Sequence, residues 1–108
     1  MSASPYGVVH FFPGGTKEQY EASKAAVHPG AGQLPPGQIF HAAGASDGGW
    51  TIMAVHDSLQ SWEAFRDGTL LPRLQQGVEG GFASPPQEQA IDLHSVTSLQ
   101  AELQRAAK

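Results

Sequence analysis

The chain lacks cysteine altogether and has few basic residues. Without cysteine, its 108 residues form no disulfide bond, hold no thiolate nucleophile and build no zinc site based on sulfur. Six basic residues against ten acidic ones give a net charge of −4. Because a nucleic-acid partner requires a basic surface, we expect none for this protein.

Long hydrophobic segments are also missing. No segment approaches the roughly 18 apolar residues that a membrane span requires. Residues 1–12 lack the basic stretch, apolar run and cleavage site of a signal peptide. We therefore expect a cytoplasmic protein that does not bind membranes.

The composition is typical of a single folded domain. The hydrophobic fraction of 40% suffices for a core, whereas the charged fraction of 15% lies below the usual level of roughly a quarter. The length matches one domain, which we place at residues 1–108 with a core of about residues 6–96. Thirteen glycines and eight prolines predict prominent loops.

Four segments have the residue types and bounding turns of β-strands. Each is rich in β-branched, aromatic or other apolar residues and ends at a turn-forming segment. The predicted strands are Tyr6–Phe12, Gln38–Ala43, Gly49–His56 and Gln89–Val96. Residues 44–49 have hairpin-turn chemistry, with Asp47 and Gly48 at the tip.

Helix-start signals predict three helical segments. Thr16 with Gln19 forms a capping box that starts a helix over residues 16–27. The second helix follows a cap at Asp57 or Ser58. Glycine and proline at positions 68 and 72 are expected to divide it, so that a short piece begins at position 69 and runs over residues 70–76. The third helix spans residues 97–107 at the C-terminal end.

The resulting order is β-α-β-β-α-β, followed by the C-terminal helix. This order predicts an α+β fold of the ferredoxin-like type, a four-stranded antiparallel sheet with two helices on one face. The first and third strands are apolar on both faces, whereas a face in contact with water usually carries polar residues. We therefore expect the bare face to pack against a second copy in a homodimer. The alternative is a monomer in which the C-terminal helix covers that face.

Histidine is the most informative residue type, because four of the five histidines fall in or at the ends of predicted strands. Alternation places His10 with Val8 and Phe12 on one face of the first strand. It places His56 with Trp50, Ile52 and Ala54 on one face of the third. These strands are adjacent in a ferredoxin-like sheet, so the two faces coincide if the register allows it.

The other two strand histidines are harder to place. By the same alternation, His41 shares a face with Ile39 on the second strand, and His94 shares a face with Asp92 on the fourth. Whether His94 and Asp92 face a pocket, an interface or solvent stays open. Each histidine can also be a hydrogen-bonded strand residue with no chemical role.

Histidine changes its charge near neutral pH, so an imidazole in an apolar pocket can remove a proton from a carbon acid or a phenol. The candidate catalytic residues are His10, His41 and His56, with His10 as the first candidate base. Flat apolar walls suit an aromatic or polyketide-like ligand. The candidate substrate-binding residues are Phe12, Trp50, Trp62 and Phe65, although a pair such as Trp62 and Phe65 is more often part of a core.

Motifs for other chemistries are weak or missing. His10 and His56 with Asp92 supply the ligand types of a two-histidine, one-carboxylate metal site, but no metal-binding spacing supports it. The segment from Pro13 to Thr16 lacks the glycine spacing of nucleotide-binding loops. We expect no metal, nucleotide or other cofactor.

The element order, the length and the segment Asp57–Phe65, in which a polar cap precedes an aromatic helix, resemble the dimeric α/β-barrel superfamily. The nearest group is that of the antibiotic biosynthesis monooxygenases, and the resemblance covers about residues 6–96. It implies a dimer with the sheets face to face and a pocket between each sheet and its helices. His10 matches the position of a first-strand histidine in this group, and Trp62 that of a second-helix tryptophan.

These observations lead to two hypotheses. The first is an enzyme that acts without metal or nucleotide on an aromatic or polyketide-like substrate, as a monooxygenase, cyclase or isomerase that uses histidine acid–base chemistry. The second is a non-catalytic ligand-binding or stress-associated homodimer, in which side chains fill the pocket. The volume of the cavity distinguishes them, since a ligand pocket needs on the order of 300 Å³.

Overall fold

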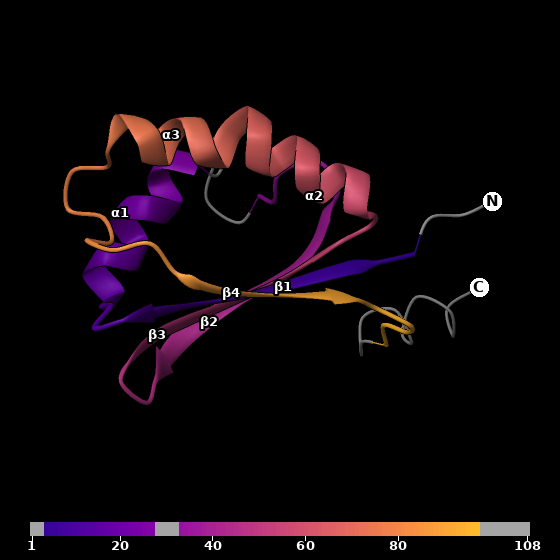
Figure 1. Ribbon diagram of the computed structural model, residues 1–108, viewed down its shortest axis with the longest axis horizontal. Coiled ribbons are helices and arrows are strands. Elements are labelled where there is room, and N and C mark those ends of the chain that lie inside the picture. The colour runs from indigo at the N-terminus through magenta and orange to yellow at the C-terminus, as the bar shows by residue number, and fades with distance from the viewer. Residues whose placement is uncertain (1–3, 28–32, 98–108) are drawn as a thin grey trace.

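The computed structural model describes residues 4–27 and 33–97, and these residues form one sheet with helices against it (Figure 1). The C-terminal helix expected over residues 97–107 lies almost entirely outside the described residues. The elements in chain order are β1 (Tyr6–Pro13), α1 (Lys17–Val27), β2 (Gln38–Ser46), β3 (Gly49–His56), α2 (Leu59–Phe65), the π-helical segment η1 (Arg66–Leu70), α3 (Leu71–Gln76) and β4 (Gln87–Asp92).

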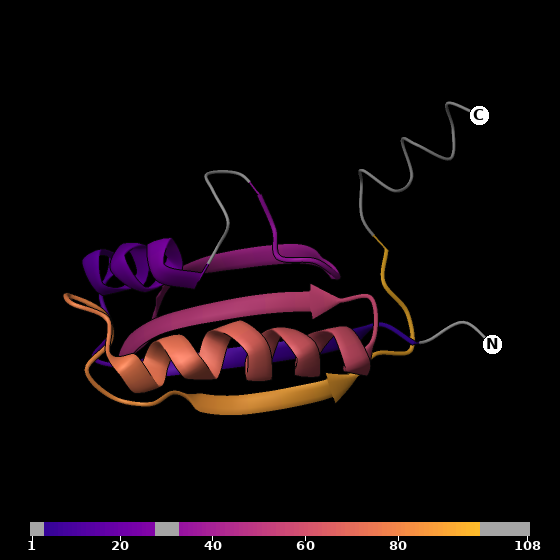
Figure 2. The ribbon, with the colours of Figure 1, turned by 90° about the horizontal axis from the view of Figure 1, so that it is seen from above.

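The sheet has the order β2-β3-β1-β4, and every neighbouring pair is antiparallel. The α+β ferredoxin-like fold predicted from the sequence is therefore confirmed. The helices of the described residues lie on one face of the sheet, with α1 on the β2 side and the helical run from α2 to α3 over β1 and β4 (Figures 1 and 2). The other face carries no helix among the described residues.

Local sequence signals explain most of the boundaries. At the start of α1, the Thr16 amide donates to the Gln19 side chain at 3.0 Å, and the Gln19 amide donates to the Thr16 hydroxyl at 3.2 Å, which is the predicted capping box. Ser58, one of the two predicted caps, accepts a hydrogen bond from the Ser61 amide at 3.1 Å. The β2–β3 hairpin turns at Asp47 and Gly48, where Gly48 has a φ of 83°.

The predicted break of the second helix at Gly68 and Pro72 is wrong. The chain stays helical from α2 to α3, because a wider π-helical turn, η1, joins the two α-helical pieces (Figure 2). A proline inside a regular α-helix lacks the amide donor and crowds the carbonyl four residues earlier. The wide turn, which ends two residues before Pro72, relieves that conflict, and no separate helix begins at Thr69.

The fourth strand is displaced from its predicted range. It begins at Gln87, two residues earlier than expected, and ends at Asp92, four residues earlier. Consequently His94 follows the strand and lies beyond its end, so its predicted position on a strand face is wrong. The earlier start has a functional consequence, because it brings Glu88 into register with His10.

The core lies between the covered face of the sheet and α2. Its buried residues are Val8, Ala54 and Trp62, with Tyr6, Phe65 and Leu70 packed against them. Within the described residues, no helix is long and apolar enough to cross a membrane.

Candidate active site

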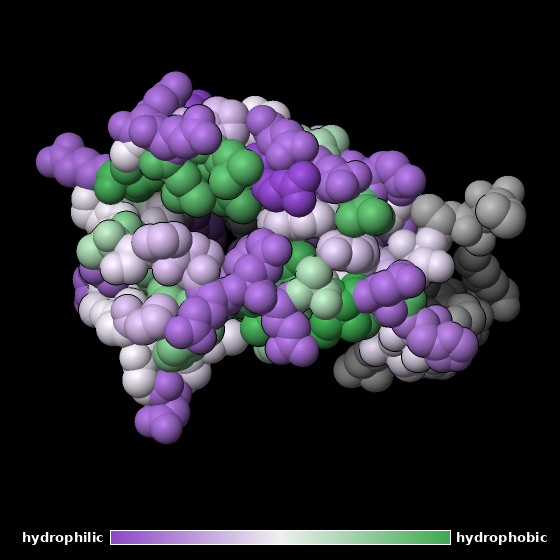
Figure 3. Space-filling view, in the orientation of Figure 1, coloured by the Kyte–Doolittle hydropathy of each residue, from purple (hydrophilic) through white to green (hydrophobic). Residues whose placement is uncertain are grey.

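A cavity of about 260 Å³ lies between the covered face of the sheet and the helices. That volume is close to the lower end of about 300 Å³ for pockets that hold drug-sized ligands, so a small aromatic compound is a suitable occupant. Most of its wall is apolar, and the polar exceptions include His10, His41, Tyr20 and Glu88. Figure 3 shows apolar surface over α3 beside a recess between that helix and the sheet.

Strand register brings the predicted faces together. His10 is opposite Ile52, Val8 is opposite Ala54, and Phe12 is opposite Trp50 across β1 and β3. The first and third strands therefore present their predicted faces on the same side of the sheet, under the helices.

His10 pairs with a carboxylate at one side of the cavity. Its Nε2 lies 2.9 Å from Oε2 of Glu88, which is the cross-strand neighbour on β4. A carboxylate only accepts hydrogen bonds, so Nε2 carries the hydrogen and Nδ1 is the nitrogen that can take a proton. The His10 ring also contacts Trp62, with 5.8 Å between ring centroids, and its side chain is 12% exposed.

A chain of hydrogen bonds occupies the opposite side and begins between α1 and β2. The Tyr20 hydroxyl lies 2.7 Å from His41 Nε2, and His41 Nδ1 lies 3.2 Å from Gln38 Oε1. The chain ends at His56, whose Nε2 lies 3.2 Å from Gln38 Nε2. Two of the three predicted catalytic histidines are thus joined through one amide side chain.

A β-bulge between Gln38 and Phe40 makes this chain possible. Simple alternation puts His41 on the same face as Ile39, and that sequence prediction is wrong. The bulge adds one residue to β2 and shifts the alternation, so Gln38 and His41 both line the cavity. Sequence parity has no means of detecting such a shift.

His56 is fully buried and does not line the cavity. Its ring packs edge-on against Trp62 at 5.4 Å, and also contacts Phe65 at 5.9 Å. Burial lowers the pKa of His56, and the negative charge of Asp57 opposes this shift. Since Nε2 accepts from Gln38, Nδ1 carries the hydrogen, and that buried nitrogen has no partner among the described residues.

Three of the four predicted substrate-binding residues line the cavity. These are Phe12, Trp62 and Phe65, whereas Trp50 does not reach it and instead contacts the Tyr20 ring at 5.3 Å. Trp62 is only 3% exposed, so it belongs to the core as well as to the cavity wall.

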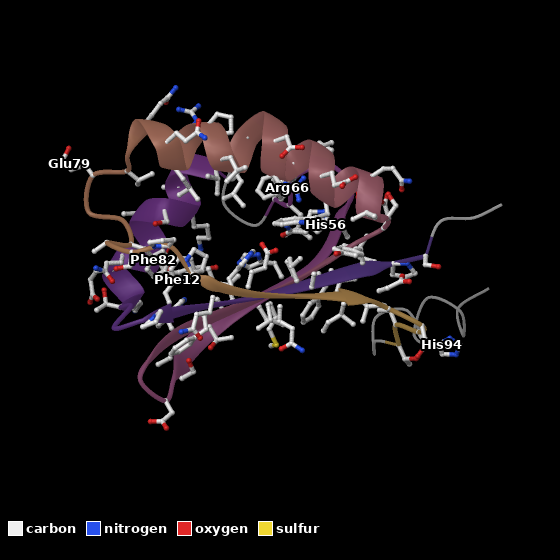
Figure 4. All side chains as sticks on the ribbon, in the orientation of Figure 1. Phe12, His56, Arg66, Glu79, Phe82 and His94 are labelled. Carbon is white, nitrogen blue, oxygen red and sulfur yellow. The ribbon has the colours of Figure 1, made fainter. Side chains whose placement is uncertain are left out.

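The loop between α3 and β4 closes one end of the cavity. Phe82 in this loop stacks on Phe12 with 3.7 Å between centroids and an interplanar angle of 11° (Figure 4). The Phe82 amide also donates to the Ser23 hydroxyl on α1 at 3.3 Å. These contacts attach the loop to both β1 and α1.

The three side chains considered as ligands of a metal site do not come together. The described residues contain no group of three histidine, cysteine or acidic side chains that is suited to a metal ion. The combination of His10, His56 and Asp92 is therefore not assembled. His94 lies near the far end of the sheet from Phe12 and outside the cavity lining (Figure 4).

Sequence reasoning missed three polar residues of the site. Glu88 was missed because the fourth strand begins two residues before the segment that the sequence predicts as a strand. Gln38 was missed because the sequence does not reveal the bulge in β2. Tyr20 was missed because nothing in the sequence places its hydroxyl beside a strand histidine. The available signal for this contact was the combination of a tyrosine in the predicted first helix with histidines in the predicted strands.

Comparisons with known proteins bear on the fold. No family model and no curated protein matches the sequence. The structure is similar to that of a monooxygenase from the gene ActVA-Orf6 of Streptomyces coelicolor in complex with the ligand Nanaomycin D. The TM-score is 0.56 at 18% sequence identity, over 89% of this chain and 92% of that chain. The resemblance seen in the sequence is thus confirmed at the level of the fold, which this chain shares with that monooxygenase.

Proposed function

We propose that the protein is an enzyme that oxidises a small aromatic compound with dioxygen, and that His10 is its general base. The observation that carries this proposal is the His10–Glu88 pair in the wall of a mostly apolar cavity. The shared fold with a monooxygenase supports the reaction type. No metal or nucleotide takes part in the proposed chemistry.

The chemistry begins with removal of a proton from an acidic C–H or phenolic O–H group of the substrate. His10 Nδ1 takes this proton, and Glu88 balances the charge of the imidazolium that forms. The substrate anion is electron-rich and transfers electrons to dioxygen. For a ring CH₂ group, one oxygen atom becomes the new ketone oxygen and the other leaves as water, so that the CH₂ group and O₂ give C=O and H₂O.

An anthrone is a suitable probe, because it is a three-ring ketone with an acidic ring CH₂ group. Oxygen consumption and anthraquinone absorbance are measured with a chelator present and without added flavin, after subtraction of the uncatalysed rate. His10→Ala is expected to lower the turnover rate by about 100-fold, the usual size of a general-base contribution. His94→Ala is the matched control, since it removes a histidine outside the cavity and is expected to leave the rate unchanged.

Two results would contradict this assignment. If His10→Ala retains the wild-type rate, His10 is not the base. If the probe binds saturably to wild-type protein without any turnover, the protein is a non-catalytic binding protein, which is the rival hypothesis.

We further propose that the protein functions as a homodimer through the open face of the sheet. Exposed apolar residues gather there: Phe40 and Met53 are each 46% exposed, and Ile91 is 37% exposed. The strand register places Phe40 and Ile91 in one row across the sheet, with Met53 in the next. A contiguous apolar patch of this kind is typical of an interface.

Sedimentation velocity at micromolar concentration tests the dimer. Wild-type protein should sediment as a dimer and Met53→Lys as a monomer, because a buried lysine without a partner opposes association. Leu59→Lys is the control, since Leu59 is 40% exposed but lies on α2, away from the open face. A monomeric wild-type protein would overturn the proposal.

A further inference from the structure

Tyr20 brings a second polar group into the cavity, away from the proposed base. It lies on α1 and is 8% exposed, and its hydroxyl is bonded to His41 on β2. Glu88, the partner of His10, lies on β4, and β2 and β4 are the two opposite edges of the sheet. A ligand in the cavity therefore lies between two separate polar groups.

The direction of the hydrogen bonds follows from the orientation of the Gln38 amide. Oxygen Oε1 of Gln38 faces His41 Nδ1, so Nδ1 donates and His41 Nε2 accepts. The Tyr20 hydroxyl is consequently the donor in its 2.7 Å bond to His41. Burial raises the pKa of Tyr20, although the nearby Lys24 charge opposes this, so the phenol stays protonated and keeps that role.

The Tyr20 ring has three neighbours that limit its movement. His41 stacks against it at 6.1 Å, Trp50 contacts it at 5.3 Å, and the Lys24 ammonium lies 5.2 Å from its centroid. A ring supported in this way presents its oxygen at a defined position.

The oxygen of Tyr20 can still accept a hydrogen bond, because its own hydrogen is engaged with His41. Among the described residues, no other side chain donates to it. In an apolar cavity, a ligand that leaves such an acceptor unpaired binds less well than one that satisfies it.

We propose that Tyr20, oriented by His41 and Gln38, selects aromatic ligands that carry a hydroxyl group at the end of the ring system nearest β2. This inference rests on the proposed function, since it assigns the substrate class of the same cavity: hydroxyarenes in preference to their ethers. His41 and Gln38 act as positioning residues that fix Tyr20 as donor to the protein and acceptor from the ligand.

The test compares 1-naphthol with 1-methoxynaphthalene, which differ in the single hydrogen that Tyr20 would accept. Binding is measured by calorimetry. Wild-type protein should bind 1-naphthol roughly three- to tenfold more tightly, the range expected for one hydrogen bond. In Tyr20→Phe this preference should disappear, with affinity for the ether little changed.

Tyr6→Phe is the matched control. It removes the same hydroxyl from a tyrosine that packs against the core but does not line the cavity, so the preference should persist. A preference that survives in Tyr20→Phe would overturn the inference. If Tyr20→Phe does not fold, as judged by circular dichroism, the wild-type comparison decides alone, since equal affinity for the two compounds would overturn it.

Failure of this inference is distinguishable from failure of the proposed function. Wild-type turnover of the anthrone without any preference for 1-naphthol would overturn the role of Tyr20 and leave the enzyme assignment intact. A preference for 1-naphthol without turnover of the anthrone would support the role of Tyr20 and overturn the enzyme assignment. Absence of binding by either naphthalene would overturn the selection by Tyr20.

Discussion

The two sides of the covered sheet face carry histidines in contrasting environments. On the β4 side, His10 lines the cavity and pairs with Glu88, whose side chain is 47% exposed. On the β2 side, His56 is fully buried and pairs with the neutral amide of Gln38.

This contrast separates a group suited to proton transfer from one suited to structure. An imidazole beside a carboxylate and a cavity can take a proton, because the new charge has a partner. An imidazole sealed against an amide has no such partner, and burial holds its pKa low. His56 is therefore linked to the cavity through Gln38 and His41, whereas His10 lines it directly.

The largest expected effect is on folding stability. His56→Ala should lower the free energy of unfolding by about 3 kcal/mol, because it leaves a cavity beside Trp62 and removes the partner of a buried amide. His10→Ala, the same change at a more open position, should cost about 1 kcal/mol. Urea unfolding monitored by tryptophan fluorescence measures both, and equal losses would contradict the contrast.

Lowering the pH should reveal the buried environment of His56 through a smaller change in the free energy of unfolding. The pKa of His56 in the folded protein lies below its unfolded value of about 6.5, so the unfolded chain binds the proton first as the pH falls. The stabilisation from neutral His56 is complete above about pH 6.5. It is lost as the pH falls toward the folded-state pKa, by at most about 1.4 kcal/mol per pH unit.

The contribution of His56 is isolated by comparing wild-type protein with His56→Gln, which does not titrate. Free energies of unfolding at pH 7 and pH 5 should show a larger loss for wild-type protein. Contributions from groups other than residue 56 are common to the two proteins and cancel in the difference. The same loss in the two proteins would mean that His56 is not the group responsible.

The smallest expected effect concerns the partner of His10. Glu88→Gln keeps the hydrogen-bond acceptor but removes the charge, so anthrone turnover should fall about fivefold, equal to about 1 kcal/mol. The effect is modest because water reaches the exposed carboxylate and replaces part of its role. Glu79→Gln is the control, since Glu79 lies on the loop away from the cavity (Figure 4). An equal rate in the two variants would argue against a role for the pair.

Much of the fold follows from local signals in the sequence. The capping box at Thr16 and the hairpin tip at Asp47 and Gly48 were predictable, because such signals depend on neighbouring residues alone. The continuous helix through Gly68 and Pro72 was not. Local propensity indicated a break at these residues. In the structure the helix continues through a π-turn, and Phe65 and Leu70 both pack against the core.

The candidate site was predictable only in part, for a related reason. Alternation within the first strand predicts which residues share a face with His10. The fold class predicts that the third strand lies beside it. The place of Glu88 in the site depends on where β4 begins, and the place of Gln38 depends on the bulge in β2. Pairing between strands sets both the start of β4 and the bulge.

The order of the elements, the set of histidines and aromatic residues, and the face that they occupy on each regular strand follow from the amino-acid sequence alone. Those properties depend on residue type and on spacing along the chain. Three features became visible only in the folded molecule. His10 pairs with Glu88, and His56 lies outside the cavity. One chain of hydrogen bonds joins Tyr20, His41, Gln38 and His56. Register, bulges and burial result from contacts between segments far apart in the chain, and no local pattern encodes them.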